Sequence, residues 1–495
     1  MTSDSQQGVV AAGHPLTAQA GARVLRDGGN AVDAALGAML TSFVAEPLLT
    51  GLGAAGYLMV AGAHEPPVLL DFFVSAPRGE PARGSQAELT AVDVSFGDAA
   101  QVFYIGPASC GVYGAPAGVC EAARLWGTIP LAQLAAPAAA LAEEGVAVNA
   151  QQAYIADILT GILTSTPECA ALWAPHGEVL REGDVLRNPE LAGALRRLGA
   201  EGAAPFYSGD IAAKVSDWVT ARGGTLGREE LAAYGAVQRE PVRVRYRGRE
   251  VLTNPPPSAG GTLLAYALAL LDREPGPPAL DAIVAVMEAA QSERNTEFVA
   301  GLGEEGFVER FLAAHLGSTT HIAVLHRDGG ACSVTVTNGE GSGVIVPGTG
   351  VHINNMLGEE DLNPLGFHRH PPGRRMPSMM APSIVLRDGA VELVLGSAGS
   401  NRIRSALLQT IVAVVDHGLA PQAAISAPRV HTEGGVLYCE PGIEIGPALA
   451  SGRDVVRFRA PNLFFGGVQA VGRDARSGAL LGGGDPRRGG VAVLA

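Results

Sequence analysis

Two adjacent threonines head an alternating apolar stretch two-thirds of the way along the chain, in the run "GSTTHIAVLH" at residues 317–326. Because β-branched residues favour strands, Thr319 and Thr320 taken alone predict only the start of a strand. If the chain were cut before Thr319, however, that residue would carry a hydroxyl nucleophile and a free α-amine together. An α-amine has a pKa of about 7.7 to 8.0, so it can serve as the base near neutral pH. The pattern leaves both interpretations open, a structural strand and an N-terminal nucleophile.

The elements that would position these threonines change in character along the chain. Residues 14–45 are typical of two small-residue helices, with Asn30 as the N-cap of the second. Residues 51–62 indicate a glycine turn that enters a strand, and residues 115–310 are expected to be mainly helical. After Thr319 the apolar residues alternate with a period of two, which predicts strands. We therefore expect one fold in which helices cover sheets.

Composition narrows the class of protein. Of 495 residues, 47% are hydrophobic and 17% are charged, which is typical of a compact globular protein. The formal net charge of −14 argues against nucleic-acid and anionic-membrane partners, since both need a basic surface. We see neither a secretory signal pattern nor an apolar run long enough to span a bilayer, so we expect a cytoplasmic location. The five scattered cysteines predict buried free thiols.

Several collinear motifs resemble the gamma-glutamyltranspeptidases, a family of N-terminal nucleophile hydrolases. They include "HPLTAQAGARVLRDGGNAVDAAL", "NPPPSAGGTLL", "STTHIAV", "LGSAGSNRI" and the closing "GGGDPRRGG". The resemblance implies an α+β fold, an αββα sandwich of two stacked, mainly antiparallel sheets covered by helices. It also implies a proenzyme that cleaves itself between Ser318 and Thr319. The products would be a helix-rich large chain, residues 1–318, and a strand-rich small chain, residues 319–495, which stay associated.

The resemblance assigns catalytic roles to residues of the small chain. Thr319 Oγ would attack a carbonyl while its own α-amine moves the proton, and water or an amine would resolve the acyl-enzyme. Thr337 matches the position whose hydroxyl supports the nucleophile. The backbone N–H groups of Gly399 and Ser400 match the turn that forms the oxyanion hole, although Ser400 stands where a second glycine is usual. An ordinary strand threonine and a purely structural turn remain the alternatives here.

The carboxylate side of the expected substrate pocket departs from the family. There an arginine in an Asp-Phe-Arg-Glu stretch grips the α-carboxylate of the glutamyl group, because a guanidinium pairs with a carboxylate through two hydrogen bonds. The corresponding stretch is "DFFVSAP", which puts Phe73 at that place, and Arg78 could substitute only in a differently shaped loop. Of the family's paired serines before Met-x-Pro, only Ser378 remains, after Pro377. One carboxylate contact is therefore expected to be lost.

The amino side of the pocket keeps acidic candidates. Glu359 aligns best with the family's acidic residue after Asn-Asn, and Glu360 and Asp361 are the alternatives. Asn338 and Glu340, in the short loop "TNGEGSG", are further candidate contacts to the substrate amine. Without the resemblance, these side chains would be interpreted as solvated surface.

The sequence predicts a self-processing threonine hydrolase or acyltransferase that cleaves an amide of a glutamyl-like or other small acyl group. One alternative is a homologue recruited to bacterial secondary metabolism that cleaves an unusual bond beside a carbonyl. Another is an unprocessed pseudoenzyme that binds a ligand or partner. We expect no cofactor and no metal, because His368 and His370 have no third ligand beside them. A homodimer is possible.

Overall fold

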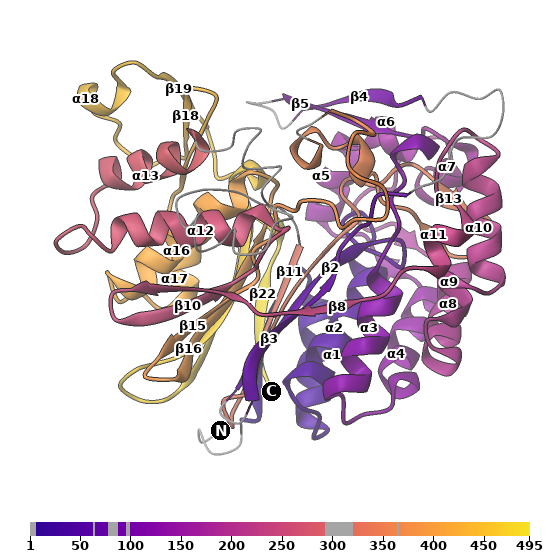
Figure 1. Cartoon of the computed structure of the whole chain (residues 1–495), viewed down its shortest axis with the longest axis horizontal. Coiled ribbons are helices and arrows are strands. Elements are labelled where there is room, and N and C mark those ends of the chain that lie inside the picture. The colour runs from indigo at the N-terminus through magenta and orange to yellow at the C-terminus, as the bar shows by residue number, and fades with distance from the viewer. Residues whose placement is uncertain (1–5, 63–64, 78–87, 96–99, 293–319, 364–365) are drawn as a thin grey trace.

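The structure, a computed structural model, describes residues 6–62, 65–77, 88–95, 100–292, 320–363 and 366–495. Its main elements form four layers, which Figure 1 shows from the side: helices, a sheet, a second sheet and further helices. The expected αββα sandwich is therefore confirmed.

The first sheet has seven strands, and every neighbouring pair in it is antiparallel. In spatial order they are β22 (Val491–Leu494), β1 (Gly8–Ala12), β11 (Thr320–His326), β12 (Ala331–Thr337), β2 (Ala55–Gly62), β3 (Glu65–Phe72) and β8 (Val237–Arg239). Strands β11 and β12, from after residue 319, lie between β1 and β2, from before it, and Val10 of β1 lies opposite Val324 of β11. The expected chains 1–318 and 319–495 would thus share one sheet, and the boundary between them stays a prediction.

The second sheet has six antiparallel strands. They are β21 (Leu480–Gly484), β20 (Gly467–Arg473), β16 (Ala390–Ala398), β15 (Ser383–Arg387), β10 (Arg249–Thr253) and β9 (Val242–Tyr246). The expectation of a mainly helical region over residues 115–310 is wrong at β8, β9 and β10. In β9, Val242, Val244 and Tyr246 are buried while the arginines between them are exposed, which is the period of two that a strand requires.

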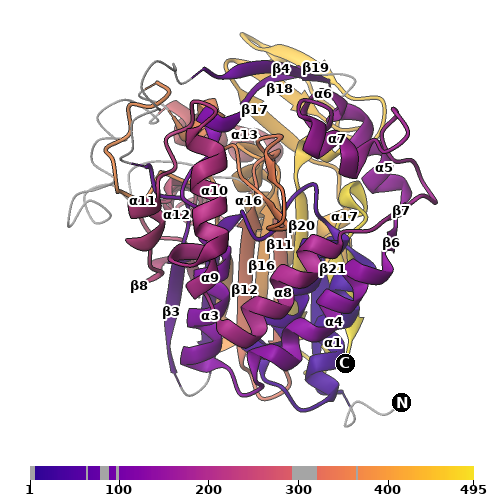
Figure 2. The same cartoon turned by 90° about the vertical axis from the view of Figure 1, so that its right-hand side faces the viewer.

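Helices lie on both outer faces of the sandwich (Figures 1 and 2). On the side of the first sheet are α1 (Pro15–Arg26), α2 (Ala31–Ala45), α3 (Ala115–Trp126), α4 (Leu131–Glu144) and α8 (Pro189–Glu201). On the side of the second are α12 (Ala259–Leu271), α13 (Leu280–Ser292), α16 (Arg402–Val415) and α17 (Pro421–Ser426). Asn30 caps α2 as expected, since its side chain accepts from the N–H groups of Val32 and Asp33. Within the described ranges, none of the helices has the length and apolar character needed to cross a membrane.

Shorter elements complete the fold. The helices are α5 (Ala150–Ile158), α6 (Thr160–Leu163), α7 (Pro167–Trp173), α9 (Ala204–Tyr207), α10 (Asp210–Thr220), α11 (Arg228–Ala232) and α18 (Pro447–Ala450). The strands are β4 (Thr90–Ser95), β5 (Ala100–Ile105), β6 (Val146–Ala147), β7 (Val185–Leu186), β13 (Ile345–Val346), β14 (Val351–His352), β17 (Val430–Glu433), β18 (Val436–Cys439) and β19 (Asp454–Arg457).

Alternation along the strands divides the core between the layers. Val9 and Ala323 point between the sheets and pack with Ile384 of the second sheet. Val10 and Val324, one residue further along, belong instead to the cluster beneath the outer helices. Both faces of the first sheet are therefore buried, which holds the strand ends that carry the site in fixed positions.

Candidate active site

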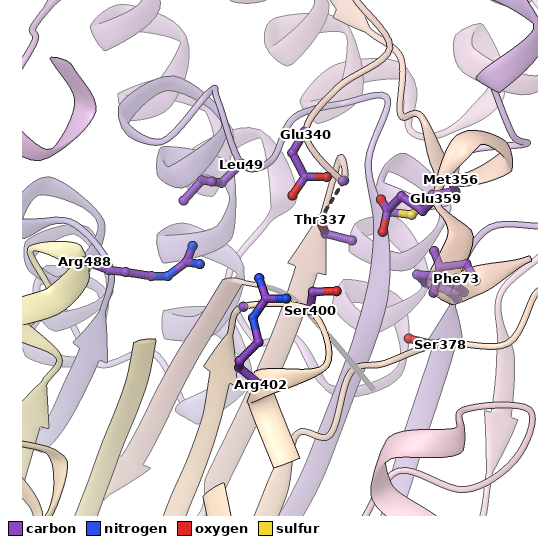
Figure 3. A pocket seen from close by; sticks show the side chains of 13 residues that line it. Leu49, Phe73, Thr337, Glu340, Met356, Glu359, Ser378, Ser400, Arg402 and Arg488 are labelled. Carbon is purple, nitrogen blue, oxygen red and sulfur yellow. Dashed lines mark hydrogen bonds between the residues drawn. The ribbon is translucent and has the colours of Figure 1, made fainter. Parts of the chain in front are cut away.

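A pocket opens where strands of the two sheets end side by side, and Figure 3 shows its lining. It is partly open to solvent, and its cavity volume is small, about 60 Å³. Most of the residues singled out from the sequence line it. The full lining is Leu49, Phe73, Thr337, Gly339, Glu340, Met356, Glu359, Leu362, Ser378, Gly399, Ser400, Arg402 and Arg488.

The strand pair β11 and β12 brings Thr337 to the middle of this pocket. Thr320, the first described residue of β11, lies opposite Val336, and Thr337 is the next residue and the last of β12. The Thr337 hydroxyl accepts a hydrogen bond from the N–H of Gly339 at 2.8 Å, drawn as a dashed line in Figure 3. Thr319 directly precedes β11 in the chain and lies outside the described residues. Its role as nucleophile stays a prediction.

The turn at Gly399 and Ser400 joins β16 to α16 at the pocket floor. Gly399 has a φ of 119°, and a Cβ there would lie 2.7 Å from Gly466 Cα, so that only glycine fits. Ser400 has a φ of 51°, a left-handed conformation that costs an ordinary residue roughly 1–2 kcal/mol. The serine thus keeps the backbone geometry that a second glycine would favour.

The wall formed by Phe73 is apolar. The Phe73 side chain is 1% exposed and stacks on Tyr57, with ring centroids 5.4 Å apart. Met356 lies beside Phe73 in Figure 3, and Leu362, which also lines the pocket, belongs to the same hydrophobic cluster. A substrate group placed against this wall would meet carbon rather than a guanidinium.

A network behind Phe73 accounts for the arginines of that region. The buried carboxylate of Asp71 pairs with Arg239 at 2.7 Å and with Arg375 at 3.3 Å. The Arg375 guanidinium also stacks 4.3 Å above the ring of Tyr234. Neither arginine lines the pocket, so neither replaces the arginine that the family keeps at position 73. Arg78, the other candidate, lies outside the described residues.

The other predicted binding residues divide into two groups. Glu340, Glu359 and Ser378 line the pocket, whereas Glu360 does not and is exposed. Asn338 is fully buried and also does not line the pocket, because its amide Nδ2 donates to the carbonyl of His352 at 3.2 Å. Its side chain holds the loop instead of facing a substrate.

The two histidines weighed as metal ligands bond to the main chain. The Nε2 atoms of His368 and His370 lie 2.9 Å from the carbonyl oxygens of Ala108 and Arg375, respectively. Both rings therefore have local structural partners.

Two arginines that the sequence did not single out line the pocket, Arg402 and Arg488. In Figure 3 their side chains lie across Thr337 and Ser400 from Phe73 and Glu359. Both belong to quoted motifs, "LGSAGSNRI" and "GGGDPRRGG". The signal was present, but the first motif does not tell where Arg402 points, and the second carries two adjacent arginines without telling which one faces the pocket.

Comparison with known proteins decides the family. A family model for gamma-glutamyltranspeptidase matches residues 17–299 and 278–495. The chain belongs to this family. It is 32% identical to the acylase ACY 1 proenzyme of Pseudomonas sp. (strain SE83), over 95% of this chain and 90% of that protein. It is 29% identical to the glutathione hydrolase proenzyme of Bacillus subtilis (strain 168), over 99% of this chain and 91% of that protein.

Solved structures agree with this assignment. The chain is similar to the cephalosporin acylase from Bacillus halodurans with a TM-score of 0.82 and 27% identity, covering 99% of this chain and 96% of that one. This member of the gamma-glutamyltranspeptidase family is therefore an enzyme of the N-terminal threonine hydrolase class. Its curated relatives include both acylases and glutathione hydrolases, so membership alone leaves the substrate open.

Proposed function

We propose that this enzyme hydrolyses amides whose acyl group is uncharged where a glutamyl group bears its α-carboxylate. The observation that carries the proposal is Phe73, an aromatic wall at the position where the family keeps its arginine. The arginines behind the ring support it as well, because both are engaged by Asp71. An α-carboxylate against Phe73 would lose its water without gaining a cation, which is unfavourable.

In the proposed reaction, the chain is first cleaved before Thr319. The Thr319 hydroxyl then attacks the amide carbonyl, so that an O–C bond forms, the C–N bond breaks, and the hydroxyl proton passes through the α-amine to the leaving amine. Water next attacks the acyl-enzyme, which releases the acid and returns the proton to Thr319. The N–H groups of the Gly399–Ser400 turn would stabilise the oxyanion in both steps.

Self-cleavage is tested on the purified protein. A denaturing gel should show two fragments, and N-terminal sequencing should start the smaller one at Thr319. Thr319→Ala should stay intact and inactive. A small fragment that begins elsewhere, or an uncut protein with full activity, would refute the mechanism.

The acyl preference is tested with four 4-nitroanilides that differ in two groups only. Gamma-glutamyl carries an amine and an α-carboxylate, 4-aminobutyryl lacks the carboxylate, glutaryl lacks the amine, and butyryl lacks both. We expect the two donors without a carboxylate to react about ten-fold faster or more, in kcat/KM, than their carboxylate counterparts. If the gamma-glutamyl anilide is the best of the four, the proposed preference is wrong.

A further inference from the structure

The pocket has two unlike ends. Phe73 and Met356 give one end an apolar wall, whereas the guanidinium groups of Arg402 and Arg488 lie at the other, across Thr337 (Figure 3). In the proposed reaction the acyl group binds at the Phe73 end, and no part of the substrate has yet been assigned to the end formed by the two arginines.

Among the described residues, neither arginine has the ion pairs that neighbouring arginines have. Arg487, the neighbour of Arg488, pairs with Glu440 and with Asp485 at 3.2 Å. Arg402 and Arg488, by contrast, form no ion pair with any carboxylate of the described residues. Their hydrogen bonds and ring contacts within the described residues are to neutral groups. Arg402 Nε donates to the carbonyl of Phe464 at 3.1 Å, its guanidinium lies 4.8 Å from the centroid of the Phe464 ring, and Nη1 lies 3.5 Å from Gln101 Oε1. Arg488 Nη2 lies 3.5 Å from the carbonyl oxygen of Leu463.

The local environment is unfavourable for the positive charges of Arg402 and Arg488. Arg402 is 6% exposed and begins α16, where the positive end of the helix dipole repels a cation. Burial, and the charge of Arg402 after it, lower the pKa of Arg488 to about 10. The buried Arg488 Nε has no hydrogen-bond partner among the described residues. Two such cations side by side would be stabilised by an anion that binds between them.

The net charge at the arginine end of the pocket would be balanced by a ligand with a single negative charge. Several carboxylates act on the two arginines, but most have other partners: Asp485 pairs with Arg429 and Arg487, and Glu433 bonds to Asn401 and His431. Burial raises the pKa of Glu46 to about 7, so that it carries only part of a charge near neutral pH. Glu340 lines the pocket with Arg402 and Arg488, and these three lining side chains together carry a net charge of about +1. A carboxylate would neutralise it, whereas a phosphate dianion would leave an excess negative charge. A planar guanidinium is also the side chain that pairs best with a carboxylate.

We propose that Arg402 and Arg488 bind a carboxylate of the substrate, and that this carboxylate belongs to the amine that leaves. The inference rests on the proposed function, in which the acyl group occupies the Phe73 end and the carbonyl lies at the Gly399–Ser400 turn between the two ends. The part of the substrate beyond the turn is then the leaving amine. The substrate class is an N-acyl amino acid, or another N-acyl amine with a carboxylate close to the scissile bond.

The test compares substrates that differ only in a carboxylate on the leaving amine. Butyryl-(3-carboxy-4-nitroanilide) should exceed butyryl-4-nitroanilide about ten-fold in kcat/KM on the self-cleaved wild type, the scale of one charge-assisted hydrogen bond. In Arg488→Gln this ratio should fall by about the same factor. Arg457→Gln, which removes an exposed positive charge from β19, should leave the ratio unchanged.

A second arm locates the carboxylate. If Arg488→Gln instead lowers the ratio of glutaryl to butyryl anilide, the arginines bind a carboxylate of the acyl group, and the assignment to the leaving amine is wrong. If the wild type cleaves the two butyryl anilides at equal rates, and glutaryl anilide no faster than butyryl anilide, the carboxylate site itself is overturned. If Arg488→Gln is not cleaved, Arg488→Lys, which keeps the charge but loses the planar fork, takes its place.

A binding measurement tests the carboxylate site independently of the proposed reaction. The uncleaved Thr319→Ala protein is titrated calorimetrically with the two butyryl anilides, and the carboxylated one should bind about ten-fold more tightly. Tighter binding without hydrolysis by the wild type would refute the reaction and keep the site. Hydrolysis with equal binding of the two compounds would refute the site alone.

Discussion

Replacing Phe73 by arginine should restore the cation that the family keeps at this place. The ring lies in the pocket wall, and behind it Asp71 carries one negative charge against the two positive charges of Arg239 and Arg375. This group therefore has a net charge of about +1. A third guanidinium at position 73 would be repelled by it and would turn toward the pocket, where a substrate carboxylate would stabilise it.

The size of the effect follows from the interaction gained. A charge-assisted hydrogen bond contributes about 1.5–3 kcal/mol, which corresponds to a factor of about ten to 150. The ratio of kcat/KM for gamma-glutamyl to 4-aminobutyryl anilide should rise by that factor in Phe73→Arg, because only the first donor has the α-carboxylate. The same change removes the stack on Tyr57, which contributes roughly 0.5–1.5 kcal/mol, so the melting temperature should fall.

The assay is the release of 4-nitroaniline by self-cleaved protein, with Phe73→Met as the uncharged control. Both variants lose the aromatic stack, and only the arginine adds charge, so the difference between their ratios isolates the carboxylate contact. The reasoning is refuted if the two variants have the same ratio. It is also refuted if the wild type already prefers the gamma-glutamyl anilide.

Two further predictions concern the turn and a buried acid. Gly399→Val should lower turnover by about 10²-fold or more in the cleaved protein. A Cβ at this φ of 119° would lie 2.7 Å from Gly466 Cα and would displace the backbone N–H donors of the turn. Near-normal turnover would place the oxyanion hole elsewhere. Burial raises the pKa of Glu46 from 4.5 to about 7, and its carboxyl accepts from Thr17 at 2.7 Å. The folded form then holds a proton that the unfolded form has lost, so the free energy of unfolding should decrease by roughly 3 kcal/mol from pH 4.5 to 7, relative to Glu46→Gln, in urea titrations. Parallel pH curves for the two proteins would contradict this.

Much of the pocket could be predicted because its residues sit in collinear motifs at strand ends. Phe73 follows β3, Thr337 ends β12 and Gly399 follows β16, and these ends meet at one edge of the two sheets. The hydrophobic period of two could identify β12 and β16, but it does not tell that they belong to different sheets. That arrangement came from the resemblance, and the structure bears it out.

What the sequence could not supply was the direction and pairing of side chains. Asn338 follows Thr337 directly, and only the folded loop shows that its amide turns to the His352 carbonyl and away from the pocket. Arg487 and Arg488 are adjacent and identical in type, yet one is neutralised by Glu440 and the other faces the pocket. The difference depends on carboxylates that lie far away in the chain.

The backbone around position 73 explains how specificity could change here without a change of fold. The N–H of Phe73 donates to Asp71 Oδ1 at 2.9 Å, and its carbonyl accepts from the Tyr234 hydroxyl at 2.7 Å. Neither bond involves the side chain of residue 73. The main chain is thus held on both sides of the residue whatever side chain it carries, and Asp71 keeps its charge balanced through Arg239 and Arg375. A single substitution at this position can therefore exchange a cation for an apolar wall while the turn, Thr337 and the opposite arginines stay in place.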